Sequence, residues 1–281
     1  MIRRLESLLA HVLLVAACAF AVYPLLWVIT LAISPTGPDA EARLLPIVTA
    51  PSLDNFRTVI GWSAPGETWL FAHQLANSLV VSLATAFVAI AVATPAAYAL
   101  ARFPFVGAKS GLGALLATQM FPTVASAVPL YLLLDTFHLL DSRSGLVLVY
   151  ASTAVPFAIF QLRGSFLAIP VDIEEAAMVD GASRARAFFL VVLPAARPAI
   201  AVTALFAFMS AWNEFILAAT LLSRKDAYTL PVVIQSYVQE QSTSWGPFAA
   251  GAILVSVPVM VLFYVAQRQL VSGLTQGGVK G

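Results

Sequence analysis

Residues 79–93 read Leu-Val-Val-Ser-Leu-Ala-Thr-Ala-Phe-Val-Ala-Ile-Ala-Val-Ala and contain no charged side chain. They form the centre of an apolar segment at about 73–101, long enough to cross a bilayer as a helix at about 1.5 Å per residue. A backbone in hydrocarbon has no water to bond with, so a run of this length must satisfy its own hydrogen bonds as a helix. The stretch therefore predicts a transmembrane helix.

Five further apolar segments repeat this pattern. They lie at about 9–33, 110–134, 145–162, 198–222 and 246–266. The chain has 281 residues, 60% hydrophobic and 10% charged, whereas a soluble domain carries about a quarter charged residues. Because so few polar groups cannot cover a water-facing surface, the apolar excess must face lipid or other helices. We predict an all-α integral membrane protein with six transmembrane helices.

The residue types that build catalytic and metal centres are scarce. Cys18 is the only cysteine, and the three histidines, His11, His73 and His138, are far apart in the sequence. Neither a G-x-x-x-x-G-K-[ST] phosphate loop nor an HExxH motif nor a nucleophile elbow occurs, so the chain itself should not hydrolyse ATP. A net charge of +1 gives no indication of a basic surface that would bind nucleic acid. We predict no enzyme activity, no catalytic residue, no metal site and no cofactor in this chain, and no nucleic-acid partner.

The N-terminal segment has two interpretations. Arg3 and Arg4 precede an apolar run, as in a signal peptide, and Val15-Ala16-Ala17-Cys18 resembles a lipoprotein cleavage box. The apolar part of a signal peptide is only about 7–15 residues long, whereas this run continues to about Ile33. We therefore predict a retained first helix.

The basic residues predict the orientation. With both termini cytoplasmic, ten Lys and Arg residues fall on inner segments and five on outer ones, as the positive-inside rule requires. The outer loops then lie at about 34–72 and 223–245, and the longest inner loop at about 163–197. The predicted divisions are the first helix with its outer loop (1–72), a membrane core (73–268) and a Gly-rich cytoplasmic tail (269–281).

The inner loop is the most informative segment. Residues 169–183 read Ile-Pro-Val-Asp-Ile-Glu-Glu-Ala-Ala-Met-Val-Asp-Gly-Ala-Ser. Asp172 is predicted to cap a short helix with Glu175 reaching back, Gly181 to close it in the left-handed conformation, and Ser183 to cap a second helix. Taken alone, two short helices joined by a tight turn fit a docking element and a membrane-surface loop equally well.

The spacing of this loop favours docking. Residues 175–177 (Glu-Ala-Ala), Gly181, Val191 and Leu193-Pro194 resemble the "EAA" loop of bacterial ABC importer permeases, with Val where Ile is usual. The resemblance implies a type I ABC importer permease fold, in which this loop docks in a cleft of a cytoplasmic ATPase subunit. The docking residues that it implies are Glu175, Ala176, Ala177, Asp180, Gly181, Leu193 and Pro194.

Other segments resemble the G-type permease subunit of maltose/maltodextrin importers. They include Asn77-Ser78-Leu79, residues 97–103 (Ala-Tyr-Ala-Leu-Ala-Arg-Phe), residues 119–122 (Gln-Met-Phe-Pro) and the C-terminal stretch 270–281. The resemblance implies an ATP-driven, binding-protein-dependent sugar importer in a bacterial or archaeal cytoplasmic (inner) membrane, working by alternating access. It also implies the partners: a second homologous permease, two ABC ATPase subunits that bind ATP and Mg, and an extracytoplasmic sugar-binding protein.

The same resemblance implies two further contacts. The Gly-rich tail, with Gly277 and Gly278, would reach the ATPase subunits; its other interpretation is a disordered end. The outer loop at 223–245 would reach the binding protein through Tyr237, Gln239 and Trp245, although a plain connector explains this loop equally well.

Polar residues within apolar segments indicate function, because burying them in a bilayer is costly. Gln119, Asn213 and Glu214 are predicted to line the translocation path or to join helices. Four prolines are predicted to bend their helices, namely Pro122, Pro129, Pro156 and Pro258. The alternatives are the same architecture with another cargo such as trehalose or a polyol, an ion-coupled secondary carrier, and a docking scaffold without transport.

Overall fold

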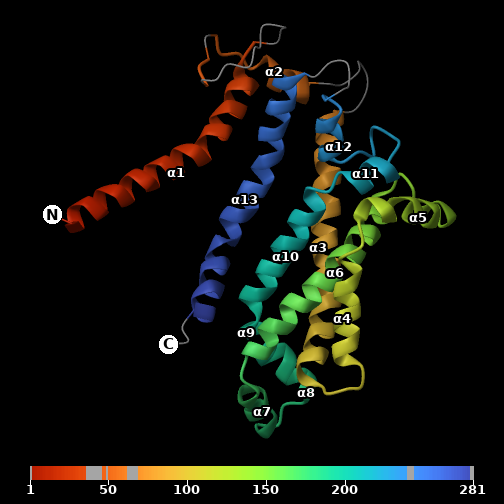
Figure 1. Cartoon of the computed structure of the whole chain (residues 1–281). Coiled ribbons are helices and arrows are strands. Elements are labelled where there is room, and N and C mark those ends of the chain that lie inside the picture. Colours follow the sequence, from red (N-terminus) through yellow and green to blue (C-terminus); the bar gives the residue numbers. More distant parts are fainter. Residues whose placement is uncertain (1, 36–45, 49, 62–68, 239–243, 279–281) are drawn as a thin grey trace. The chain divides into compact units, whose positions relative to one another are not determined.

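A computed structural model describes residues 2–35, 46–48, 50–61, 69–238 and 244–278, but not the side chains of 2–5 and 268–278. Nearly all regular structure in these ranges is helical (Figure 1). The helices are α1 (Ile2–Ile33), α2 (Asp54–Ile60), α3 (Leu70–Arg102), α4 (Ala108–Thr118), α5 (Thr123–Thr136), α6 (Arg143–Ala168), α7 (Val171–Val179), α8 (Arg184–Ala187), the π-helix η1 (Phe188–Val192), α9 (Leu193–Ala195), α10 (Arg197–Trp212), α11 (Ile216–Leu221), α12 (Leu230–Gln235) and α13 (Trp245–Gly278).

Four helices in the described ranges are long and apolar enough to cross a membrane. These are α1, α3, α6 and α13. Two bent pairs raise the number to six if each pair is one span: α4 with α5, bent by 94°, and residues 184–195 with α10, bent by 73°. The prediction of a helical membrane protein is confirmed, with four to six candidate spans.

Two predicted segments are interrupted, which corrects the picture of continuous helices. The segment 110–134 breaks at Gln119–Pro122, because Pro122 has an extended backbone and disfavours a helical residue before it. The segment 198–222 breaks after Trp212, and α11 begins again at Ile216. Pro129, Pro156 and Pro258 lie inside α5, α6 and α13, so only one of the four prolines coincides with a break.

Contacts divide the chain into two compact units. Unit 1 comprises residues 1–73 and 233–258, and unit 2 comprises residues 74–232 and 259–281. In unit 2, α6 packs against α10 and α4 (Figure 1). Ala93 and Ala97 on α3 are fully buried in one cluster with residues of α6. Because small residues let helix backbones approach closely, they explain this packing.

Unit 1 is organised around Asn55 on α2. Its Nδ2 donates to the carbonyl oxygens of Ala32 and Ser34 at 3.0 and 2.8 Å, which satisfies acceptors at the end of α1. Gly246 passes so close that a Cβ there would lie 2.6 Å from Asn55 side-chain atoms. Residues 6–26 of α1 are exposed, with Phe20 at 85%, as expected of a helix that faces lipid.

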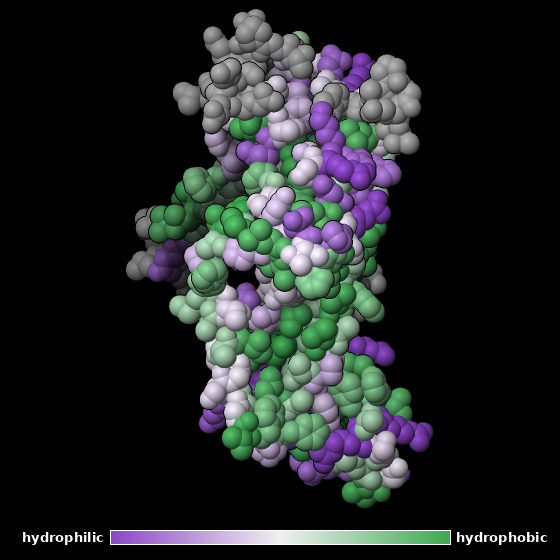
Figure 2. All heavy atoms as spheres, turned by 90° about the vertical axis from the view of Figure 1, so that its right-hand side faces the viewer, coloured by the Kyte–Doolittle hydropathy of each residue, from purple (hydrophilic) through white to green (hydrophobic). Residues whose placement is uncertain are grey.

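Figure 2 shows one face of the molecule on which hydrophobic side chains occupy the middle and hydrophilic ones gather toward the two ends. This is the distribution that a bilayer requires, because charged side chains are costly at its centre.

Candidate functional site

The predicted docking residues lie in one surface element at an end of unit 2, formed by α7, α8, η1 and α9 (Figure 1). The turn after α7 has the hydrogen bonds of a Schellman motif: Gly181 N–H to Met178 O at 3.1 Å and Ala182 N–H to Ala177 O at 3.0 Å. Gly181 has φ +91°, a value that side chains disfavour. Ser183 caps α8 by accepting the N–H of Arg186 at 3.3 Å. The predicted turn and second cap are therefore confirmed.

The predicted cap of the first helix is wrong. Pro170, in an extended conformation, occupies the N-cap position, and Asp172 is the second residue of α7 without a capping bond. The preceding helix α6 ends at Ala168, and Pro170 cannot continue it, so α7 begins immediately after the proline.

The element presents its turn to the surface. Glu175, Ala176, Asp180 and Gly181 are exposed, and Ala177 is half-buried. Leu193 and Pro194 are half-buried at the other end of the element. Small exposed residues around a tight turn let another protein surface approach closely, which is the geometry that docking needs. That these residues contact an ATPase stays a prediction.

Sequence reasoning missed the residue that holds this element in place, Glu174. Its side chain is 5% exposed and accepts from Arg102 Nε at 2.9 Å and from the Tyr98 hydroxyl. Arg102 Nη2 also donates to Ile169 O at 2.9 Å. The available signal was the four-residue spacing of Tyr98 and Arg102, which places both on one face of α3.

An aromatic cluster surrounds these polar groups. The Tyr98 ring lies 4.4 Å from that of Phe188 in η1 and 5.9 Å from those of Phe166 in α6 and Phe103. The guanidinium of Arg184 lies 5.1 Å from the Phe103 ring centroid. The docking element is therefore packed against both α3 and α6.

The predicted intramembrane residues lie at the two helix breaks, and two of them, Gln119 and Glu214, contact α6. Gln119 Nε2 donates to Thr153 O at 3.0 Å, and the Tyr150 hydroxyl donates to Glu214 Oε2 at 2.8 Å. Tyr150 and Thr153 are three residues apart, hence on one face of α6. Asn213 donates to Met209 O within its own helix at 2.9 Å, and its side chain is exposed, as is that of Gln119.

The predicted outer contact residues are only partly described, and they lie in unit 1. Tyr237 is half-buried, and burial raises the pKa of its phenol. Trp245 is 52% exposed and meets the Phe248 ring edge-on at 6.1 Å. Gln239 lies outside the described residues. Gly277 and Gly278 lie in the last turn of α13. Their proposed contacts with partners stay predictions.

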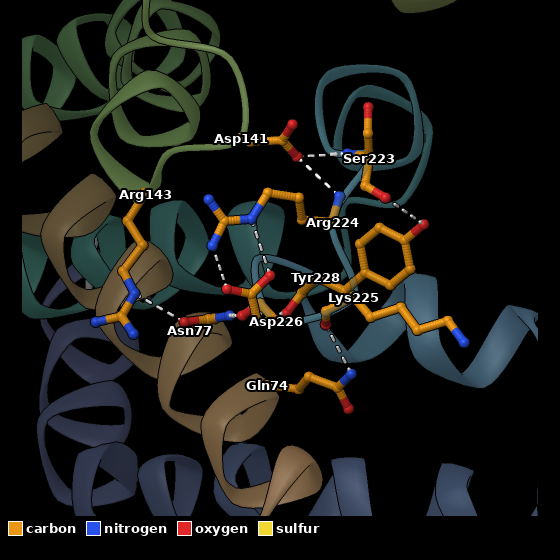
Figure 3. A network of polar contacts seen from close by, with 9 residues as sticks. All are labelled: Gln74, Asn77, Asp141, Arg143, Ser223, Arg224, Lys225, Asp226 and Tyr228. Atoms are coloured by element: carbon orange, nitrogen blue, oxygen red, sulfur yellow. Dashed lines mark hydrogen bonds and ion pairs between the residues drawn. The ribbon is translucent and has the colours of Figure 1, made fainter. Parts of the chain in front are cut away.

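A polar network in unit 2 holds the loop at residues 223–229, and sequence reasoning gave no role to the residues of this network (Figure 3). Asn77 Nδ2 donates to Asp226 O at 2.7 Å and to Tyr228 O at 3.0 Å, while its Oδ1 accepts from Arg143 Nε at 2.7 Å. Gln74 Nε2 donates to Lys225 O at 3.0 Å. Asn77, two turns into α3, thereby fixes residues 225–228.

The other side of this loop is held by Asp141. Its carboxylate accepts the backbone N–H groups of Ser223 and Arg224 at 2.5 and 3.0 Å. Arg224 also pairs with Asp226, whose carboxylate raises the pKa of the guanidinium. The residues of this network come from three separate segments, around Asn77, Asp141 and Arg224. Their spacing in the sequence therefore gives no sign that they are in contact.

The comparisons with known proteins agree with this geometry. A family described as "Binding-protein-dependent transport system inner membrane component" matches residues 89–276. The trehalose transport system permease protein SugB of Mycobacterium tuberculosis is 36% identical over 264 residues, covering 93% of each chain. The maltose/maltodextrin transport system permease protein MalG of Vibrio parahaemolyticus is 37% identical over 289 residues, covering 96% of this chain and 95% of the relative.

Solved structures support the same assignment. A chain of a bacterial ABC transporter involved in import of the acidic polysaccharide alginate superposes with a TM-score of 0.75 and 25% identity, covering 94% of this chain and 96% of that one. The predicted resemblance to ABC importer permeases is therefore confirmed. The chain belongs to the binding-protein-dependent transport system inner membrane components, and it is a multi-pass, non-catalytic permease subunit of that family.

Proposed function

We propose that this chain is one of two homologous permease subunits of an ATP-driven sugar importer and receives the motion of a cytoplasmic ATPase through α7–α9. The observation that carries the proposal is the exposed turn at Gly181, held in a left-handed conformation between two short helices. A protruding turn of small residues suits insertion into a cleft on another protein. Two ATPase subunits would bind the ATP and Mg.

We infer that both termini are cytoplasmic. The support is electrostatic, because this orientation assigns ten basic residues to inner segments and five to outer ones. The same orientation places the docking element on the ATPase side. It directs the loop fixed by Asn77 toward an extracytoplasmic binding protein.

The proposed mechanism is alternating access. ATP favours a closed ATPase dimer, and differential binding of ATP to that state shifts the conformational equilibrium of the complex. The breaks at residues 119–122 and 213–215 let helix halves reorient separately. Gln119, Asn213 and Glu214 lie at these breaks, so we assign them to the translocation path or to gating.

The proposed cargo is an oligosaccharide of the maltose/maltodextrin type. One relative is named for trehalose and another for maltose/maltodextrin, at nearly equal identity, so trehalose is the alternative.

The test uses proteoliposomes that hold the chain, its partner permease and the ATPase. ATP hydrolysis is measured with binding protein loaded with maltose, with maltodextrin or with trehalose. Stimulation by a loaded binding protein supports the importer and identifies the cargo. No stimulation by any of the three, in a complex shown to be assembled, contradicts the proposal.

A further inference from the structure

Two adjacent carboxylates on α7 have opposite environments. Glu175 is exposed in the predicted docking turn, whereas the Glu174 side chain is 5% exposed. Burying a carboxylate is costly unless charged and hydrogen-bonding partners satisfy it. Glu174 has both kinds, because Arg102 and Tyr98 occupy its two oxygens separately. This carboxylate therefore faces the interior of the permease, away from any docking partner.

Arg102 joins three helices at one point. Its Nε bonds Glu174 on α7 and its Nη2 bonds Ile169 O, the carbonyl just after α6, each at 2.9 Å. Its own side chain is 6% exposed. Charge-assisted hydrogen bonds in a low-dielectric site are strong and directional. One guanidinium consequently holds α7 and the end of α6 to α3.

The other end of the docking element is built differently. There η1 occupies Phe188–Val192, and the chain bends by 73° between residues 184–195 and α10. A π-helix is a local irregularity that is frequent at functional sites. The element is thus clamped to α3 by charge and joined to α10 through a bend.

We propose that Tyr98, Arg102 and Glu174 form a latch that makes α7 and the Arg102 end of α3 move as one body. Motion imposed on the docking turn then reaches α3 directly, and α10 follows through η1. These are positioning residues, since they act through α7. The inference rests on the proposed function, because it takes the turn at Gly181 as the ATPase contact.

The test is the ratio of sugar transported to ATP hydrolysed in proteoliposomes of the whole complex. Glu174→Gln removes the charge and is expected to lower the ratio about tenfold while stimulated ATP hydrolysis persists. Tyr98→Phe keeps the aromatic packing and removes only the hydroxyl, so its ratio should fall by about threefold. Arg102→Lys keeps the charge, but a lysine cannot reach Glu174 and Ile169 O together. Its ratio should therefore lie between the ratios of the other two variants.

Asp172→Asn is the matched control, because Asp172 is an exposed carboxylate two residues away on α7 and is not a predicted docking residue. It is expected to leave both the ratio and the stimulated ATP hydrolysis unchanged. If Glu174→Gln fails to assemble, Tyr98→Phe and Arg102→Lys decide the question. An unchanged ratio in these variants, or a proportional loss of both activities, overturns the latch. Absence of stimulated hydrolysis in the unmodified complex instead overturns the proposed function.

Discussion

Tyr150 on α6 donates a hydrogen bond to Glu214 Oε2 at 2.8 Å, and the Glu214 carboxylate also accepts the backbone N–H groups of Leu217 and Ala218 at 2.8 and 3.0 Å. The carboxylate therefore satisfies orphan donors at the start of α11, where a negative charge is also favoured by the helix dipole. Glu214 thus explains how the chain tolerates a break at this point. It ties the second half of the broken segment to α6.

Glu214→Ala should lower the free energy of unfolding by about 1–2 kcal/mol, because two backbone donors and one hydroxyl lose their partner. Thermal unfolding of the purified chain in detergent measures this. Asp135→Ala is the control: Asp135 is an exposed carboxylate on α5 whose side chain has no partner among the described residues. Equal stability of the Glu214→Ala and unmodified proteins would contradict the capping role.

Gly181→Asp should abolish most transport while the ATPase stays bound. The backbone has φ +91°, which costs a branched residue about 1–2 kcal/mol, and the added charge occupies the turn. Transport by the assembled complex is the measurement. Gly164→Ala is the control, because Gly164 lies exposed within α6 with no atom near its missing Cβ. Normal transport by Gly181→Asp would show that the turn is not the docking contact.

Asn77→Ala should loosen the loop at 223–229. It removes three hydrogen bonds, worth about 1 kcal/mol each, that join α3, Arg143 and this loop. Amide hydrogen exchange in the loop should become faster, by tenfold or more if two bonds are lost in full. Gln74→Ala removes one bond to the same loop and should have a smaller effect. Identical exchange in both variants and the unmodified chain would argue against Asn77 as the anchor.

Gly246→Ala should destabilise unit 1 by about 1–3 kcal/mol, because its Cβ would lie 2.6 Å from Asn55, which is buried and bonded to α1. Gly251→Ala is the matched control, since its Cβ would meet only side-chain atoms at longer distances, those of Ile234 at 3.3 Å and Val59 at 4.0 Å. The measurement is the midpoint of thermal unfolding. A larger loss for Gly251→Ala than for Gly246→Ala would refute this packing.

Hydropathy predicted the long spans because length and apolar composition are local properties. The turn at Gly181 and the Ser183 cap could also be predicted from the sequence, since each depends only on neighbouring residues. The bend predicted at Pro122 coincides with the first break, whereas the break after Trp212 was not predicted, because no proline or glycine marks it in the sequence.

The buried Glu174 was missed for a different reason. Two adjacent glutamates look equivalent in a sequence, and only the packing of α7 on α3 separates the buried one from the exposed one. The loop network around Asn77 depends on contacts between residues about 150 positions apart, which no local pattern reveals.

The central claim is that the turn after α7 meets an ATPase and does not rest on the membrane. A photo-crosslinker tests it when attached at Val179→Cys in a Cys18→Ser background, because Val179 is 87% exposed beside the turn and is not a predicted docking residue. A probe at Phe20→Cys on the exposed face of α1 serves as the lipid-facing control. In the assembled complex, the account predicts an adduct between the Val179 probe and the ATPase subunit. Adducts with lipid alone, as at Phe20, would contradict it.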